Sequence, residues 1–278
     1  MGDRRCPDLF SRSMYLPPEL INRILEYLTD DSQSLKAVSL VSKTWTTWCQ
    51  ARLFESVRLT PPVLQRWLKD VSQEADGPAS HTRTLALEEY RLIPWINPQY
   101  LDFPPSALSS FSDVKSLSLI QWNATLFSGA SPEPHFCHFS KSLCRLSLQF
   151  CMLDPVILFD FLSLLPNVDD LDIAYPYISP GGLRTIQNVP DTSPSFRGTL
   201  SLAGIQSDRL ILKALTALPL RFSTIRIKSC AFYGPDEYQT LLTGCGDTLV
   251  TLRFEKCYHG ALRAYPELVQ CVFIFPNF

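Results

Sequence analysis

The sequence lacks the signatures of most enzyme classes and of structural metal sites. It contains no G-x-S-x-G motif, no H-E-x-x-H motif and no glycine-rich phosphate loop. Its four histidines are scattered, and the nine cysteines include no Cys-x-x-Cys pair. Structural zinc sites usually use such pairs at fixed spacings. We therefore expect no catalytic residue, no cofactor and no metal ion in this chain.

One short segment does combine metal-ligand residue types. His135 and His138 flank Cys137, and Cys144 follows seven residues later. The two histidines are only three residues apart in a proline-rich segment, unlike the spacings of structural zinc sites. We interpret this cluster as unrelated to metal binding.

The sequence also has no excess of charge of one sign and no long apolar run. Lysine and arginine total 25 against 27 for aspartate and glutamate, whereas a nucleic-acid-binding face needs concentrated positive charge. No uncharged apolar stretch approaches the roughly 18–20 residues that cross a bilayer. The first residues, MGDRRCPDLFSRS, lack the apolar core of a signal peptide, and the odd cysteine count favours reduced thiols. We expect a cytoplasmic and/or nuclear protein with no nucleic-acid or membrane partner.

Apolar spacing predicts three short helices within residues 16–54. In the first, Leu20, Ile24 and Leu28 recur every four residues, and Ile21 and Leu25 widen the stripe. The segment from Thr29 to Ser32 ends that helix and offers N-caps for the next. The second and third helices are marked by Leu35, Val38 and Val41 and by Trp45, Trp48 and Cys49. So small a unit has little interior, so part of its apolar surface should meet a partner.

The same segment resembles an F-box. It reads LPPELINRILEYLTDDSQSLKAVSLVSKTWTTWCQARLFESVRL, with Leu-Pro-x-Glu-Leu, Ile-Leu-x-x-Leu, Val-Ser-Lys and Trp at the family's spacing. The resemblance implies binding to the Skp-type adaptor of an SCF (Skp–cullin–F-box) ubiquitin ligase, and through it to a cullin. The positions that match the motif's apolar residues are Leu16, Pro17, Ile24, Leu28, Leu35, Val38, Val41 and Trp45. A simpler interpretation makes them core residues of the three-helix unit, and spacing does not settle which of them face the adaptor.

The remainder of the chain repeats one pattern, which resembles the leucine-rich repeat L-x-x-L-x-L-x-x-(N/C)-x-L. The segments beginning at Leu143 and Phe222 fit it at nearly every position. Sliding the pattern along the chain gives equivalent anchors at Val57, Leu85, Leu117, Leu146, Leu171, Leu200, Ile225 and Leu252, and a weak last one at Val272. Successive anchors from Val57 to Leu252 are 25 to 32 residues apart. Each repeat is predicted to form a short strand followed by a covering helix. The repeats should stack, because no single repeat can bury its own apolar face.

We therefore predict an α/β fold in which a three-helix F-box leads directly into a curved leucine-rich-repeat solenoid of about eight or nine repeats. The predicted ranges are a disordered lead over 1–13, the F-box over 14–55 and the repeats over 56–278. The clearest covering helices fall within 155–165, 210–218 and 238–242, and irregular loops are expected around 94–105, 128–134 and 179–194. Cys151, Cys230 and Cys257 share one repeat column and are expected to have a structural role.

The residues that flank each anchor should lie on the open face of the sheet. They place acidic residues in the middle repeats and a basic group in the late ones. The candidate substrate-binding residues are Arg145, Asp170, Asp172, Arg226, Lys228 and Arg253. The last three could contact an acidic or phosphorylated segment, but the simpler interpretation, which we favour, is that these charges only solvate the open face of the sheet.

The sequence thus predicts a non-enzymatic substrate-recognition subunit of an SCF ubiquitin ligase. The alternative is a leucine-rich-repeat scaffold or interaction protein that acts outside ubiquitin ligation. Co-purification with the adaptor would distinguish the two.

Overall fold

The protein is represented by a computed structural model that describes most of the chain. The described residues are 16–28, 31–41, 43–70, 77–88, 108–123, 133–178, 196–205, 209–229, 231–232, 236–255, 258–259 and 271–274. The chain divides into two compact units, Met1–Leu53 and Phe54–Phe278, hereafter unit 1 and unit 2. The predicted domain ranges, 1–13, 14–55 and 56–278, stay predictions. The lead over 1–13 lies outside the described residues. The same holds for the loops expected at 94–105 and 179–194 and for most of the loop expected at 128–134.

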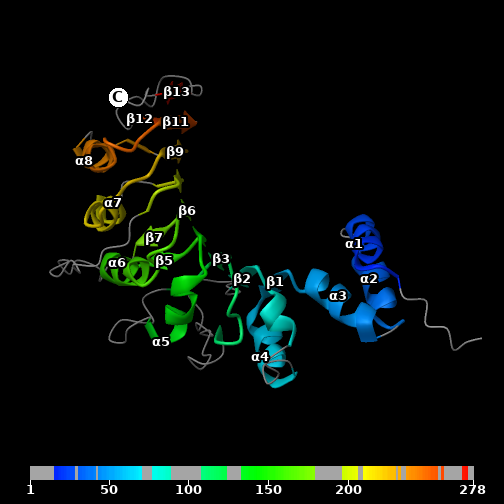
Figure 1. The fold of residues 1–278 in the computed structure, drawn as a ribbon. Helices are drawn as coiled ribbons and strands as arrows, with labels where there is room; N and C mark the ends of the chain where they lie inside the picture. The colour runs from blue at the N-terminus through cyan, green and yellow to red at the C-terminus, as the bar shows by residue number, and fades with distance from the viewer. Residues whose placement is uncertain are drawn as a thin grey trace, which may run out of the picture. The chain divides into compact units, whose positions relative to one another are not determined.

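Unit 1 consists of the three predicted helices, which are α1 (Pro18–Tyr27), α2 (Ser32–Ser39) and α3 (Lys43–Leu53) (Figure 1). Pro18 occupies the first helical position of α1, where the absent amide hydrogen is not needed. Asp31 caps α2 by accepting hydrogen bonds from the amides of Gln33 and Ser34 at 3.1 and 3.0 Å. The Ser34 side chain and these amides lower the pKa of the Asp31 carboxyl, because they stabilise its ionised form.

Unit 2 is built on a nine-stranded sheet whose order follows the chain. The strands are β1 (Ser56–Leu59), β2 (Thr84–Glu88), β3 (Ser116–Ile120), β4 (Arg145–Gln149), β6 (Asp170–Ala174), β8 (Thr199–Ala203), β9 (Thr224–Lys228), β11 (Thr251–Glu255) and β13 (Cys271–Ile274). Every neighbouring pair from β1 to β11 is parallel. The register places all eight predicted anchors from Val57 to Leu252 in one row across these strands, which confirms their predicted equivalence.

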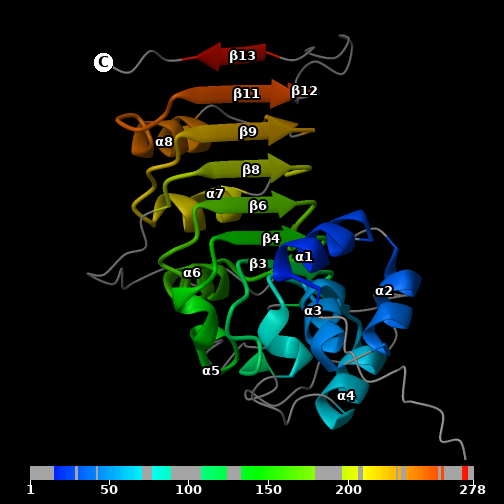
Figure 2. The same ribbon diagram turned by 45° about the vertical axis from the view of Figure 1, so that its right-hand side comes forward.

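The ninth strand corrects the sequence interpretation of the last anchor. Val272 was expected to begin a further copy of the repeat, but β13 pairs with β11 in the antiparallel direction. Phe273, rather than Val272, therefore lies opposite Leu252. Figure 2 shows the reversed direction of β13 beside the aligned strands from β4 to β11. The parallel series ends at β11.

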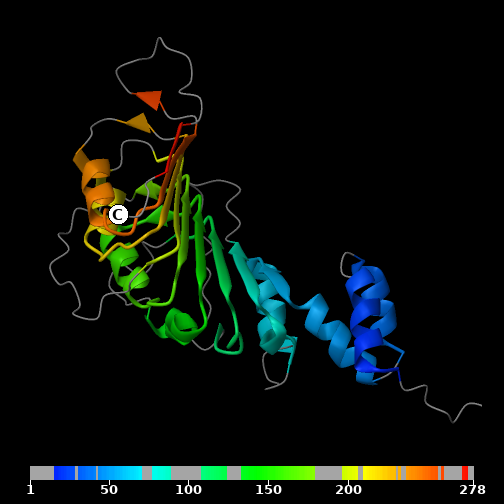
Figure 3. The same ribbon diagram turned by 45° about the horizontal axis from the view of Figure 1, so that its top comes forward.

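Helices cover one face of this sheet. The three predicted covering helices are α6 (Pro155–Ser163), α7 (Arg209–Thr216) and α8 (Asp236–Gly244), and Figures 1 and 3 show them on the same side of the strands. Further helical segments are α4 (Pro61–Asp70), the 3-10 helix η1 (Pro78–His81), α5 (Glu133–Phe136) and the 3-10 helix η4 (Cys137–Lys141). Two small parallel pairs, β5 (Met152–Leu153) with β7 (Tyr177–Ile178) and β10 (Ala231–Phe232) with β12 (Tyr258–His259), follow the main strands.

The core of unit 2 lies between the sheet and these helices. Each strand alternates, so that in β4 Leu146 and Leu148 are buried while Arg145, Ser147 and Gln149 lie on the other face. One continuous buried apolar cluster runs from Val57 to Leu252. The stacked repeats thus share a single interior, because each parallel strand from β1 to β11 contributes inward side chains to the same layer.

A row of left-handed backbone conformations marks the carboxyl ends of five neighbouring strands. The residues fourth after the anchor all have positive φ, and they are Gln121 (58°), Phe150 (54°), Tyr175 (50°), Gly204 (62°) and Ser229 (53°). Each donates its amide hydrogen to the carbonyl that ends the next strand, over 2.7–2.8 Å. The backbone ladder is thereby extended by one hydrogen bond per repeat at this edge. Positive φ is usually signalled by glycine, and only Gly204 among these five residues is a glycine, so the sequence does not predict this feature.

Candidate interaction surfaces

Helix α1 carries two apolar stripes. Ile21 and Leu25 are buried, and together with Leu35 and Cys49 they form the small core of unit 1. The second stripe, Leu20, Ile24 and Tyr27, is exposed, and Tyr27 is 87% exposed. Its spacing of four and three residues places all three on one face of the helix. An amphipathic helix needs only one apolar stripe to close its own core, and the second stripe is not part of the core formed by the described residues of unit 1.

Two apolar residues that follow α2 are exposed as well. Leu40 is 87% exposed and Val41 is 73% exposed, whereas Leu35 within α2 is buried. We call Leu20, Ile24, Tyr27, Leu40 and Val41 the apolar surface of unit 1. Exposed large apolar residues are ordinary when scattered, but five in so short a segment are typical of an interaction site.

The structure separates the eight predicted adaptor-binding residues into two groups. Leu35 is buried, and four others pack partly buried against the core of unit 1, namely Leu16, Leu28, Val38 and Trp45. Pro17, Ile24 and Val41 are exposed. Sequence reasoning missed Leu20, Tyr27 and Leu40. A second set of apolar residues at helical spacing, at positions 20, 24 and 27, would have identified Leu20 and Tyr27. It runs beside the set at positions 21, 25 and 28, which packs into the core.

On unit 2, the acidic candidates lie on the sheet face opposite the helices and are engaged by neighbouring strands. Arg145 Nε lies 3.2 Å from Asp170 Oδ2, and the other oxygen of Asp170 accepts a 3.0 Å hydrogen bond from the Thr199 amide. The Ser147 hydroxyl donates to Asp172 Oδ2 over 2.9 Å. Within the predicted acidic spot, Asp170 is therefore paired with a cation of its own sheet, and Asp172 accepts a hydrogen bond from a neutral hydroxyl.

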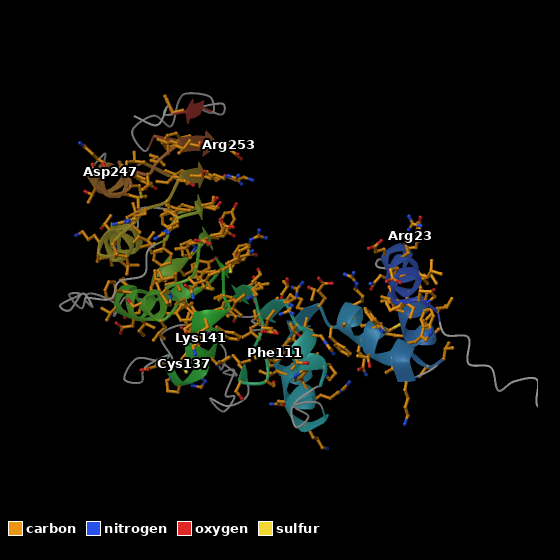
Figure 4. The ribbon with its side chains drawn as sticks, in the orientation of Figure 1. Arg23, Phe111, Cys137, Lys141, Asp247 and Arg253 are labelled. Atoms are coloured by element: carbon orange, nitrogen blue, oxygen red, sulfur yellow. The ribbon has the colours of Figure 1, made fainter. Side chains whose placement is uncertain are left out.

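The three basic candidates form a different environment, which we call the basic cluster. Arg226 on β9 and Arg253 on β11 are paired in register, as are Lys228 and Glu255. Arg253 Nε lies 2.6 Å from Glu255 Oε1, whereas Arg226 forms no ion pair within the described part of the chain. Figure 4 places Arg253 on the side of the sheet away from Asp247, which lies on the helix side. Arg226, Lys228 and Arg253 thus lie on the open face, where Arg253 is paired with Glu255.

Two exposed aromatic residues, which sequence reasoning missed, follow the neighbouring strands β4 and β6. Phe150 and Tyr175 belong to the left-handed row and are 43% and 42% exposed. Their rings are stacked, with centroids 5.2 Å apart and an interplanar angle of 8°. Leucine-based patterns do not reveal this pair, because both residues fall one position beyond the predicted strands.

The cysteine column and the histidine segment have structural surroundings. The buried Cys151 thiol donates to the Leu119 carbonyl over 3.2 Å, which fits its predicted role, whereas Cys230 and Cys257 lie outside the described residues. Burial lowers the pKa of His138 to about 4, and its ring lies 3.9 Å from that of Phe139. Among the described residues, no group of three or more Cys, His, Asp or Glu side chains is arranged to hold a metal ion.

Neither the described helices nor the comparisons with known proteins assign a role. No helix in the described part of the chain combines the length and apolar character needed to cross a bilayer. The chain matches no model of a known protein family, and no curated protein sequence is significantly similar to it.

Proposed function

We propose that this protein is the substrate-recognition subunit of an SCF ubiquitin ligase. Unit 1 acts as an F-box that binds the Skp-type adaptor and through it a cullin, and unit 2 acts as a leucine-rich-repeat domain that holds a protein substrate. The chain itself has no catalytic role and brings the substrate close to the other subunits, in the cytoplasm and/or the nucleus.

The observation that carries this proposal is the apolar surface of unit 1. Among its described residues, unit 1 has four fully buried apolar core residues and leaves Leu20, Ile24, Tyr27, Leu40 and Val41 exposed. Fully burying an exposed large apolar side chain contributes about 1.5–3 kcal/mol, and the half-buried Leu20 and Ile24 would contribute less, so a partner that covers this surface gains affinity. Ile24 and Val41 also match apolar positions of the F-box pattern, which links the surface to the adaptor.

Support for a binding role of unit 2 comes from its open face. The repeats supply polar and charged side chains from every parallel strand to one surface, and no helix in the described part of unit 2 lies over it. Stacked repeats of this kind provide extended binding surfaces. A scaffold outside ubiquitin ligation would use the same face, so adaptor binding distinguishes the two functions.

Co-expression with a Skp-type adaptor, followed by size-exclusion chromatography, tests the proposal. We expect the full chain to form an equimolar complex, and the Ile24→Asp/Val41→Asp double variant to lose it. The matched control is Asn22→Asp/Gln33→Asp, which adds the same two charges at exposed positions, with residue 22 on the opposite side of α1 from Ile24. A folded wild-type chain that forms no complex, or a control variant that loses it equally, would refute the proposed function.

A further inference from the structure

Two ion pairs on the open face of unit 2 join adjacent strands. Arg58 Nη2 on β1 lies 2.6 Å from Glu88 Oε2 on β2. Arg145 Nε on β4 lies 3.2 Å from Asp170 Oδ2 on β6. Adjacent strands are only about 4.8 Å apart, so an arginine reaches a carboxylate on the next strand without leaving the face.

Asp172 and Arg226 are separated by a further strand. Asp172 on β6 is in register with Ser201 on β8, and Ser201 is in register with Arg226 on β9. Each of the three lies between two buried apolar residues of its own strand, so all three side chains lie on the open face. Two strand steps of about 4.8 Å place the Cα atoms of Asp172 and Arg226 roughly 10 Å apart. We call these three residues the polar row.

The two charged residues of the polar row have no opposite charge beside them. Asp172 accepts a 2.9 Å hydrogen bond from the neutral Ser147 hydroxyl, and it forms no ion pair within the described part of the chain. Arg226 is exposed and, among the same residues, also forms none. Beyond Arg226 the register continues to Arg253, a second cation, which is paired within its own strand. An anion and a cation thus stand on either side of a small hydroxyl.

Neighbouring side chains orient the carboxylate of Asp172. The Ser147 hydroxyl donates to Asp172 Oδ2, and the side-chain amide of Gln149 donates to the Ser147 hydroxyl over 3.0 Å. The other oxygen, Oδ1, accepts no hydrogen bond from the described residues. A carboxylate that is already held by one oxygen loses little conformational freedom when a cation binds the other.

The side chains between the two charges are short. Ser201 lies between them, and Ala174 and Ala203 lie in register beside it on the same face. A polypeptide backbone can therefore come close to the sheet at this point. The Ser201 hydroxyl, which bonds to none of the described residues, can bond to a main-chain group of that backbone. Main-chain groups inside a helix are bonded to one another, so an extended segment suits this place better than a helix.

We propose that the polar row binds an extended segment of a partner protein that carries one basic and one acidic side chain about three residues apart. The basic side chain meets Asp172, the acidic side chain meets Arg226, and the main chain between them bonds to Ser201. In polyproline II geometry, residues i and i+3 share one side of the segment at about 9.3 Å, close to the roughly 10 Å across the row. The inference deepens the proposed function, because it names the class of substrate segment that unit 2 would hold.

Charge complementarity selects a segment of mixed charge. An acidic segment would be repelled by Asp172, and a basic segment would be repelled by Arg226. A neutral segment would remove water from both charges without replacing its hydrogen bonds, which costs free energy. Charge-assisted hydrogen bonds are about twice as strong as neutral ones, so a segment that carries both charges gains at both ends of the row.

The test measures the binding of short synthetic peptides to the purified full chain without adaptor. Each peptide carries a neutral fluorescent label and two test residues separated by two prolines, which hold the segment extended. The mixed probes contain Lys-Pro-Pro-Glu or Glu-Pro-Pro-Lys, and the control probes have two Lys, two Glu or two Gln at the same positions. Fluorescence anisotropy at low salt should show saturable binding, with at least one mixed probe bound about fivefold more tightly than every control probe. Mixed probes with one or four prolines between the charges should bind more weakly.

Protein variants locate the site. Asp172→Asn and Arg226→Gln should each weaken the mixed probes about three- to fivefold. Asp172→Arg should make the probe with two Glu the tightest, and the exchange Asp172→Arg/Arg226→Asp should restore binding of a mixed probe. The matched controls are Asp247→Asn and Lys115→Gln, which make the same charge changes at exposed positions, with Asp247 on the helix side of the sheet (Figure 4). Neither control should change the affinity.

The outcomes separate this inference from the proposed function. No saturable binding of the mixed probes overturns the inference, as does a control probe that binds equally well, since either result shows that the row does not select mixed charge. A mixed-probe affinity that Asp172→Asn and Arg226→Gln leave unchanged also overturns it. Adaptor binding is measured on the same variants, which should all form the equimolar complex. Peptide binding without adaptor binding would refute the ligase role and keep the inference, and adaptor binding without peptide binding would do the opposite.

Discussion

Substitutions at two neighbouring positions of the left-handed row, Gly204→Ala and Ser229→Gly, test the structural basis of the Phe150–Tyr175 aromatic pair. Gly204 and Ser229 occupy equivalent positions in neighbouring repeats, with φ of 62° and 53°. Gly204→Ala places a Cβ in a left-handed conformation, which destabilises the native state by about 1–2 kcal/mol. It also displaces the Tyr175 ring, with a further loss of about 0.5–1.5 kcal/mol of stacking with Phe150.

The unfolded state partly offsets this loss. Alanine has fewer unfolded conformations than glycine, which returns about 0.4–1 kcal/mol. We therefore expect Gly204→Ala to reduce the free energy of unfolding by about 0.5–3 kcal/mol. Ser229→Gly relieves the same backbone strain but increases unfolded-state entropy, so its change should stay within about 0.5 kcal/mol. The hydrogen bond that the amide of residue 229 donates to the Glu255 carbonyl, 2.8 Å long, is preserved in this variant.

Urea unfolding followed by far-ultraviolet circular dichroism measures both variants, with the free energy obtained by linear extrapolation. Near-ultraviolet circular dichroism reports separately on the Phe150–Tyr175 stack. The reasoning is refuted if Gly204→Ala is as stable as the wild type, or if Ser229→Gly is the more destabilised of the two.

Three further changes probe the core, a helix cap and a buried histidine. Leu171→Ala should destabilise unit 2 by about 2–5 kcal/mol in urea unfolding, because its fully buried side chain leaves a cavity between sheet and helices. Asp154→Ala should cost about 1 kcal/mol, since this carboxylate caps α6 by accepting from the amides of Val156 and Ile157. The lowered pKa of His138 means that the unfolded chain binds more protons between about pH 6.5 and 4. The free energy of unfolding should therefore be highest above about pH 6.5 and should decrease by about 1–2 kcal/mol as the pH falls to about 4. This value is reduced for partial solvent screening. His138→Gln should remove most of this pH dependence.

Each of these has an outcome that contradicts it. Asp172→Asn, a polar change on the open face, is the control for Leu171→Ala, and equal destabilisation by both would contradict the placement of the core. An unchanged free energy in Asp154→Ala would show that the α6 cap contributes nothing. A pH profile of His138→Gln identical to that of the wild type would assign the acid sensitivity to other groups.

The repeat register was predictable because it depends on a simple physical pattern. Each strand buries two alternate apolar residues, and the spacing of these pairs along the chain identifies Val57, Leu146 and Leu252 as equivalent. The helices of unit 1 were predictable for similar reasons, since Pro18 and Asp31 mark helix starts and apolar residues recur at helical spacing.

Other features depend on information that the pattern does not contain. Alternation is the same in both chain directions, so the short apolar segment around Val272 fits a parallel repeat as well as the antiparallel strand that it forms. The left-handed conformation of Phe150 and Tyr175 is imposed by hydrogen bonds to neighbouring strands rather than by their residue types. In α1, both stripes have helical spacing, so only packing reveals that Ile21 is buried and Leu20 is exposed.

The reversal of β13 bears on self-association. A sheet in which all strands are parallel presents complementary edges, so the last strand of one copy could accept the first strand of another in register and build a head-to-tail filament. In unit 2 the sheet runs from β1 at one edge to β13 at the other. Because β13 opposes β11, an incoming β1 cannot continue the parallel series. The reversed strand thus interrupts the in-register parallel pairing by which a second copy would extend the repeat sheet.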